Sequence, residues 1–211
     1  MRLLRVVAVS TVGLSPVIAG AQAPSQTAGV PTPSQHLGFT VGADRTLADW
    51  GQITGYFQRL ATVSRAVHID TLGPTTNGQP FIVAVISTPA NIARLPEIRA
   101  AQARLADPRR LTPDDERRLV ASQPSVIFVS NNIHGSEIGG SQMAMELAYR
   151  LATNDSLQRH LENEIVLIAP SMNPDGQRMI TEEVALEIVR TWLETPFEGG
   201  RHLRRIQLID E

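Results

Sequence analysis

The chain has 211 residues, of which 42% are hydrophobic and 19% charged, a composition typical of a soluble globular domain. Its formal net charge of −2 provides no basic field of the kind that attracts nucleic acid or an anionic membrane surface. The absence of cysteine excludes disulfides, Fe–S clusters and cysteine-ligated zinc. His, Asp and Glu are left as possible metal ligands.

The N-terminus has the pattern of a signal peptide, predicted over residues 1–21. Arg2 and Arg5 form a short basic start, residues 6–20 are apolar and uncharged, and small residues follow. The apolar run is shorter than the roughly 20 residues that a membrane-spanning helix needs. We therefore expect cleavage after Ala21 or Ala23, and a mature protein that is secreted or periplasmic and not bound to the membrane.

Residues 22–36 are rich in Pro, Ser, Thr and Ala without periodicity, which predicts a disordered linker. Residues 37–211 are predicted to form one domain. In its first half, apolar residues at helical spacing predict a helix over residues 47–63 with Thr46 as its N-cap. Two strands are expected at 67–72 and 81–87, joined by a turn. Residues 91–122 are expected to be helical, with Thr112 capping a helix that begins at Pro113.

The second half alternates between strand and helix. Two short apolar runs, at residues 125–130 and 165–169, are predicted to be strands buried on both faces. Helices are expected over 137–152, with Met143, Leu147 and Leu151 along one face, and over 180–193. This order predicts an α/β fold, a mixed sheet flanked by helices.

His134 and Glu137 directly follow the first of these buried strands. They are three residues apart on a strand-to-helix turn, so both side chains can converge on one point. Imidazole nitrogen and carboxylate oxygen are both zinc ligands, and open α/β sheets bind ligands at the carboxyl ends of their strands. Taken alone, the pair is equally well explained as a hydrogen-bonded surface pair.

The second buried strand is followed by Asn173-Pro174-Asp175-Gly176. These residue types are common in ordinary β-turns, which is the alternative explanation. Two motifs at neighbouring strand ends, in this order, are nevertheless much more specific than either one.

The sequence H-G-S-E, followed after one helix and one strand by N-P-D-G, resembles the carboxypeptidase A-like zinc metallocarboxypeptidases, and in particular their secreted bacterial branch. The resemblance covers only the N-terminal part of that family's domain. It implies one Zn²⁺ held by His134, Glu137 and a later histidine, and a peptide substrate. It also implies that Asn173, Asp175 and Gly176 belong to a loop bordering the substrate cleft.

Two parts of the family pattern are missing. The family's third zinc ligand lies on a later strand, whereas only His160 and His202 follow Glu137 here, and neither is expected to be a ligand. The catalytic general base, a glutamate in the family, is unidentified and is expected beyond residue 211. Ser136 stands where digestive members carry arginine, which leaves the substrate class open. We therefore expect a domain that is truncated at its C-terminus and inactive by itself.

Two other functions remain open at this stage. One is a zinc-dependent deacylase of N-acyl amino acids, which has a similar H-G-x-E site. The other is a secreted, non-catalytic remnant domain that keeps only the front half of the fold.

Overall fold

The computed structural model describes residues 29–180, 182–196 and 199. In chain order its elements are α1 (Pro33–Leu37), α2 (Trp50–Val63), β1 (Val67–Pro74), β2 (Pro80–Ile86), α3 (Pro89–Ala93), α4 (Leu95–Ala106), the 3-10 turn η1 (Pro108–Arg110), α5 (Pro113–Ser122), β3 (Ser125–Ser130), α6 (Ile138–Thr153), α7 (Asp155–His160), β4 (Glu164–Ala169), α8 (Pro174–Met179) and α9 (Glu182–Glu194). The predicted signal peptide lies outside the described residues. None of the described helices is long and apolar enough to span a membrane.

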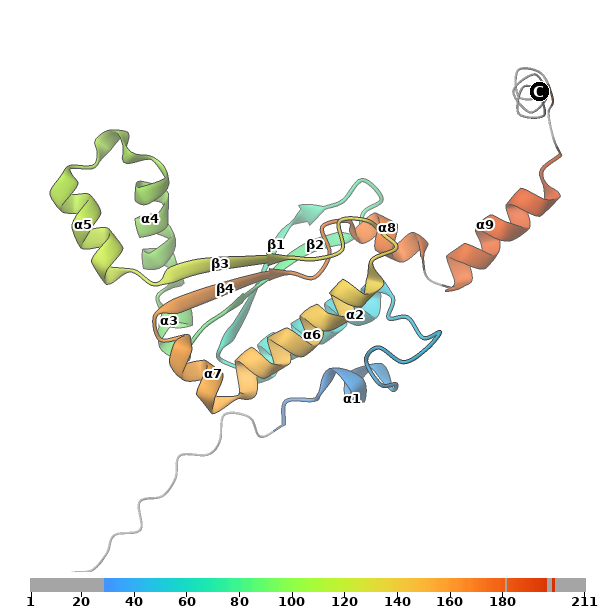
Figure 1. The fold of residues 1–211 in the computed structure, drawn as a ribbon, viewed down its shortest axis with the longest axis horizontal. Coiled ribbons are helices and arrows are strands. Elements are labelled where there is room, and N and C mark those ends of the chain that lie inside the picture. Colours follow the sequence, from blue (N-terminus) through green and yellow to red (C-terminus); the bar gives the residue numbers. More distant parts are fainter. Residues whose placement is uncertain (1–28, 181, 197–198, 200–211) are drawn as a thin grey trace, which may run out of the picture.

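The four strands form one mixed sheet in the order β1-β2-β4-β3. β2 pairs antiparallel with both β1 and β4, whereas β3 and β4 are parallel. Helices α2 and α6 lie along one face of the sheet, and α4 and α5 project beyond one end of it (Figure 1). The predicted mixed sheet flanked by helices is therefore confirmed.

The two faces of the sheet follow the alternation of the strands. In β2, Ile82, Ala84 and Ile86 pack into the main core with α2 and α6. Val85 points the other way and forms a second, smaller cluster with Ile165 of β4 and with Leu95 and Ile98 of α4. The burial predicted for the 165–169 strand is thus confirmed by β4.

The burial predicted for the strand at residues 125–130, which is β3, is wrong. Val126, Ile127 and Phe128 of β3 are 42%, 43% and 55% exposed, although their β-branched and aromatic side chains suit a strand interior. The cause is position, because β3 is an edge of the sheet and no described strand lies on its other side. The apolar run predicted the strand itself but not its neighbours.

The predicted linker is also not wholly irregular, because its last residues begin helix α1. Thr32 and Gln35 form a reciprocal capping box around Pro33. Leu37 is buried in the main core. These local hydrogen bonds and this burial explain why a Pro/Ser/Thr-rich segment forms a helix here.

Two smaller differences concern the predicted helices. Helix α2 is capped by Asp49, whose side chain accepts a hydrogen bond from the backbone of Gln52, whereas Thr46 donates to the carbonyl of Asp44. In α6, Met143 is 45% exposed while Met145 is fully buried. The face of α6 that meets the sheet is therefore shifted from the predicted one.

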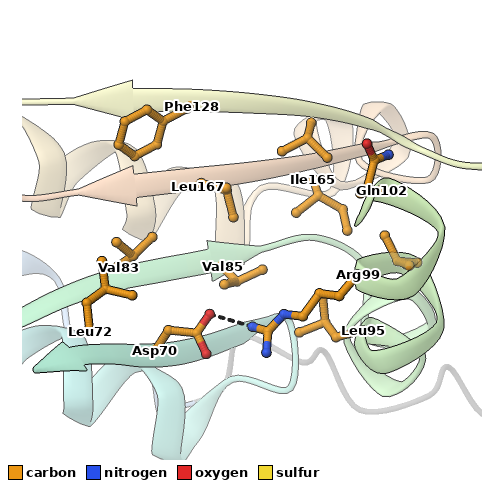
Figure 2. A pocket seen from close by; sticks show the side chains of 12 residues that line it. Asp70, Leu72, Val83, Val85, Leu95, Arg99, Gln102, Phe128, Ile165 and Leu167 are labelled. Carbon is orange, nitrogen blue, oxygen red and sulfur yellow. Dashed lines mark hydrogen bonds and ion pairs between the residues drawn. The ribbon is translucent and has the colours of Figure 1, made fainter. Parts of the chain in front are cut away.

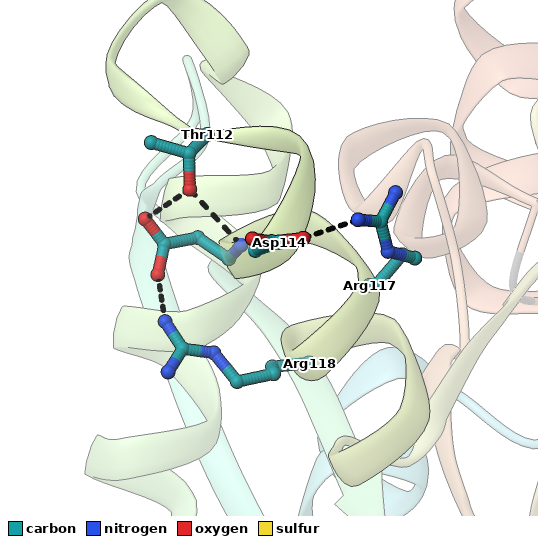
Figure 3. A network of polar contacts seen from close by, with 5 residues as sticks. Thr112, Asp114, Arg117 and Arg118 are labelled. Atoms are coloured by element: carbon teal, nitrogen blue, oxygen red, sulfur yellow. Dashed lines mark hydrogen bonds and ion pairs between the residues drawn. The ribbon is translucent and has the colours of Figure 1, made fainter.

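The N-terminus of α5 is built as expected (Figure 3). The Thr112 hydroxyl accepts a hydrogen bond from the backbone N–H of Asp115 and donates one to its carboxylate. Arg118 also pairs with Asp115, and Arg117 pairs with Asp114. The hydrogen bonds from Thr112 and Arg118 hold the pKa of Asp115 below its ordinary value.

Candidate metal centre

The ends of β3 and β4 are joined by a short set of hydrogen bonds. The backbone N–H of Asn131 and its side-chain amide both donate to the carbonyl of Ala169, at 3.2 Å and 3.1 Å. In return, the N–H of Met172 donates to the carbonyl of Asn131 at 2.8 Å. The loops that carry the two motifs therefore leave the sheet side by side.

His134 and Glu137 lie on the exposed loop between β3 and α6. The backbone N–H of His134 donates to Oε2 of Glu137 at 3.1 Å, and the N–H of Glu137 donates to the carbonyl of His134 at 2.9 Å. Among the described residues nothing hydrogen-bonds to the His134 imidazole. One carboxylate oxygen and both ring nitrogens are thus left for another partner.

The second motif is the start of a helix rather than a free turn. Asn173 is the N-cap of α8, and its Oδ1 accepts a hydrogen bond from the N–H of Gly176 at 2.9 Å. Pro174 occupies the first turn of α8, where its missing N–H costs nothing. The residues that suggested a turn therefore fix the direction in which the chain leaves β4.

Asp175 links this helix start to the β1–β2 hairpin. Its Oδ1 accepts a hydrogen bond from the Thr75 hydroxyl at 2.5 Å, and its Oδ2 accepts one from the backbone N–H of Asn77 at 3.3 Å. The tip of the hairpin is therefore held against the loop that follows β4.

A buried polar network lies between the two loops, and it was not predicted from the sequence. Asn132 has a left-handed φ of 50°, and its amide donates to Ser141 at 3.1 Å and to Gln177. Gln177 also accepts from the Ser141 hydroxyl at 2.9 Å and donates to the carbonyl of Ala48 at 3.3 Å. Ser171 donates to the carbonyl of Asn132 at 3.3 Å.

This network fixes the backbone two residues before His134. All four of its side chains are buried, and the hydrogen bonds among them hold these side chains in one arrangement. Oδ1 of Asn132 has no hydrogen-bond partner among the described residues. Asn132 lies in a loop and Gln177 in the short helix α8, and neither position carries a sequence signal of burial, so no local pattern could have identified these residues.

The donor types present fit zinc, but they form an incomplete set. Catalytic zinc takes three protein ligands and a water, whereas the described residues contain no group of three His, Cys, Asp or Glu that could hold a metal. The other described histidines are engaged or remote. His36 contacts the carbonyl of Gln52, His68 pairs with Asp70, and His160 ends α7 on the surface. His202 lies outside the described residues.

Comparison with known proteins identifies the family to which this chain belongs. Residues 53–196 match the profile of the zinc carboxypeptidase family, which is more than half of the chain. The chain belongs to the zinc carboxypeptidase family. No functionally curated protein matches it.

Three of the solved structures that match this chain are the following. Carboxypeptidase A from Helicoverpa armigera is 17% identical, with 71% of this chain and 32% of that chain covered and a TM-score of 0.47. Bovine thrombin-activatable fibrinolysis inhibitor, in complex with tick carboxypeptidase inhibitor, is 11% identical, with coverages of 66% and 35% and a TM-score of 0.45. A putative carboxypeptidase from Burkholderia mallei is 19% identical, with coverages of 60% and 25% and a TM-score of 0.36. This chain thus spans about a third or less of the length of these structures.

Proposed function

We propose that this chain supplies the metal-binding loop of a zinc-dependent metallocarboxypeptidase, which removes C-terminal residues from peptides. His134 and Glu137 are its first two zinc ligands in this proposal. The observation that carries it is the exposed loop at the end of β3. On this loop the His134 imidazole, which has no hydrogen-bond partner among the described residues, stands three residues from a carboxylate. Membership in the zinc carboxypeptidase family supports the choice of metal.

The roles of the residues follow from their contacts. Zinc, when bound, polarises a scissile carbonyl and lowers the pKa of a water to roughly 7. His134 would bind through a ring nitrogen and Glu137 through the oxygen that the backbone leaves free. Asn173, Asp175 and Gly176 would border the substrate cleft, with Asp175 also holding the hairpin tip. The third ligand and the general base come from outside the described residues in this proposal.

Zinc titration of the full 211-residue chain tests the ligand assignment. Two ligands in place of three predict weak binding, because a complete coordination shell supplies much of the affinity. His134→Ala and Glu137→Ala should each abolish the binding measured by calorimetry. His160→Ala, on the surface of α7, is the matched control and should leave it unchanged. Equal binding by His134→Ala and the unaltered chain would refute the assignment.

Substrate turnover separates the remaining functions. We expect the zinc-loaded chain to hydrolyse neither a peptide with a free C-terminus nor an N-acyl amino acid, because its ligand set is incomplete. Peptide turnover that depends on His134 would support the carboxypeptidase function. It would also refute the expectation that the 211-residue chain lacks a third zinc ligand. Turnover of the N-acyl amino acid alone would instead identify a deacylase.

Export is a separate part of the proposal. The basic start, apolar run and small residues around Ala21 and Ala23 support a removable signal. In a bacterial host with an export system, mass spectrometry should find a mature N-terminus at Gln22 or Pro24. Exported protein that still begins at Met1 would count against a cleaved signal.

A further inference from the structure

The carboxylate of Asp175 joins two segments that are far apart in the sequence. Its Oδ1 accepts a hydrogen bond from the Thr75 hydroxyl at 2.5 Å, and its Oδ2 accepts one from the backbone N–H of Asn77 at 3.3 Å. Thr75 lies 100 positions before Asp175, in the turn between β1 and β2, and this hairpin tip lies beside α8 (Figure 1). Both carboxylate oxygens are thus engaged by the hairpin tip.

The hairpin tip is itself a closed turn. The N–H of Gly78 donates to the carbonyl of Thr75 at 3.0 Å, and the N–H of Thr75 donates to the carbonyl of Gln79 at 2.8 Å. The N–H of Gln79 in turn donates to the Thr75 hydroxyl at 2.9 Å. Because a hydroxyl has one proton, the Thr75 hydroxyl accepts from its own turn and gives that proton to Asp175. The tip therefore presents a fixed donor to the carboxylate.

On its other side, Asp175 is one residue away from a contact with the loop between β3 and α6. Gly176 packs against Gly135 with no room for a side chain between the two backbones. The Asn173 cap fixes the position of Gly176 at the start of α8. Gly135 directly follows His134, so a shift of this helix start also moves the loop that carries both proposed zinc ligands.

We propose that Asp175 is a positioning residue of the metal centre. It holds the start of α8 to the hairpin tip, and the contact between Gly176 and Gly135 carries this constraint to residues 131–137, the metal-binding loop. The inference rests on the proposed function, because it takes His134 and Glu137 as zinc ligands. Two ligands bind a metal only if both are held in place together, and residues that orient ligands typically change metal affinity 10–100-fold.

The alternative is that Asp175 contacts a metal or a substrate directly. Thr75→Val distinguishes the two roles, because it keeps the carboxylate and removes only the donor that anchors it. A direct role predicts that this variant binds metal as well as the parent, since the carboxylate is then freer to reach it. A positioning role predicts weaker binding.

A second carboxylate anchors the same hairpin away from the metal-binding loop. Asp70 of β1 pairs with Arg99 of α4 beside an apolar groove of about 560 Å³ (Figure 2). Helix α4 contacts the chain just before β3, where Gln102 donates to the carbonyl of Pro124, whereas the metal-binding loop follows the end of β3. Asp70→Asn is therefore the matched control for Asp175→Asn.

Zinc titration of the full 211-residue chain by calorimetry tests the proposal. Thr75→Val and Asp175→Asn should each raise the zinc dissociation constant about tenfold. The double variant should match Asp175→Asn alone, because both changes break one contact. Thr75→Ser keeps the hydroxyl and should retain the affinity of the parent.

Two controls should bind zinc as the parent does. One is Asp70→Asn. The other is Thr76→Val, the same exchange at an exposed neighbour whose side chain makes no hydrogen bond among the described residues. Circular dichroism checks that every variant folds.

Amide hydrogen exchange of the zinc-free chain supplies a readout that needs no metal. Thr75→Val should accelerate exchange within residues 131–137 and leave α4 and α5 as in the parent. Thr76→Val should change neither region.

The outcomes separate this inference from the proposed function. If His134→Ala abolishes zinc binding but Thr75→Val does not weaken it, the positioning role is refuted and the ligand assignment stands. Unchanged exchange of residues 131–137 in Thr75→Val would refute the positioning role as well. If His134→Ala binds zinc like the parent, the ligand assignment itself is refuted, and this inference with it.

Discussion

Gly135 and Gly176 are in direct backbone contact. A Cβ atom added to Gly135 would lie 2.6 Å from both the carbonyl carbon and the carbonyl oxygen of Gly176, a distance that folded proteins do not tolerate. The loop after β3 and the helix start after β4 fit together only because residue 135 has no side chain. The residue next to His134 therefore determines how closely the two motifs approach each other.

Gly135→Ala should separate these two segments. We expect a loss of roughly 1–3 kcal/mol in the free energy of unfolding, typical of overpacking against a rigid backbone, together with weaker zinc binding. Gly139→Ala is the control, because a Cβ there has nothing within 4 Å and alanine favours helix by up to about 1 kcal/mol. Urea denaturation measures the free energy of unfolding of both variants, and calorimetry measures their zinc binding. Equal stability of the two variants would show that the contact is not constrained.

Gln177→Leu should destabilise the buried network while keeping a side chain of similar size. It removes the acceptor of the Ser141 hydroxyl and leaves the carbonyl of Ala48 without its donor, whereas the Asn132 amide keeps its bond to Ser141. Each buried group left unsatisfied costs about 1–3 kcal/mol. Gln58→Leu, on the exposed side of α2, should change stability by less than about 0.5 kcal/mol. A Gln177→Leu variant as stable as the parent, by urea denaturation, would contradict a structural role for the network.

The burial of Tyr56 should make the free energy of unfolding decrease at alkaline pH. Its ring is fully buried and its hydroxyl donates to the carbonyl of Pro31 at 3.3 Å. Burial first, and then the nearby Glu146 and Tyr149, raise the pKa of this phenol above its ordinary value. Because the folded pKa exceeds the unfolded value of about 10, its contribution is complete below that pH and is lost as the pH rises above it.

Tyr56→Phe should therefore reduce the decline in unfolding free energy as the pH rises above about 10. At neutral pH the same change should cost about 1 kcal/mol, for the lost hydrogen bond. Tyr149→Phe keeps Tyr56 and should retain the alkaline decline. An identical pH profile for the parent and Tyr56→Phe, by urea denaturation, would contradict this assignment.

Local signals in the sequence were sufficient for most of the elements. Thr112 and Pro113 mark the start of α5 by their chemistry alone. The Asp49–Gln52 capping box was equally visible, and giving it preference over Thr46 would have placed the start of α2 correctly. Helix α1 carried the same kind of signal at Thr32 and Gln35, which the surrounding composition outweighed.

The remaining features depend on residues that are distant in the chain. The exposure of Phe128 depends on which strand lies beside β3, and a run of apolar residues contains no information about that neighbour. Likewise, the bond between Asn132 and Gln177 joins residues 45 positions apart. The family motif indicated His134 and Glu137, but the side chains that fix their loop could be found only in three dimensions.

The strand order β1-β2-β4-β3 also constrains the sequence of events when the chain leaves the ribosome. β1 and β2 can form their hairpin at once, because they are adjacent in the chain. β3 emerges next, but its partner in the sheet is β4, and the whole of α6 and α7 separates the two. Until Glu164–Ala169 has been synthesised, Val126, Ile127 and Phe128 have no partner strand. During that interval the apolar strand is exposed and prone to aggregation, and a pause in translation between α6 and β4 would favour misassembly.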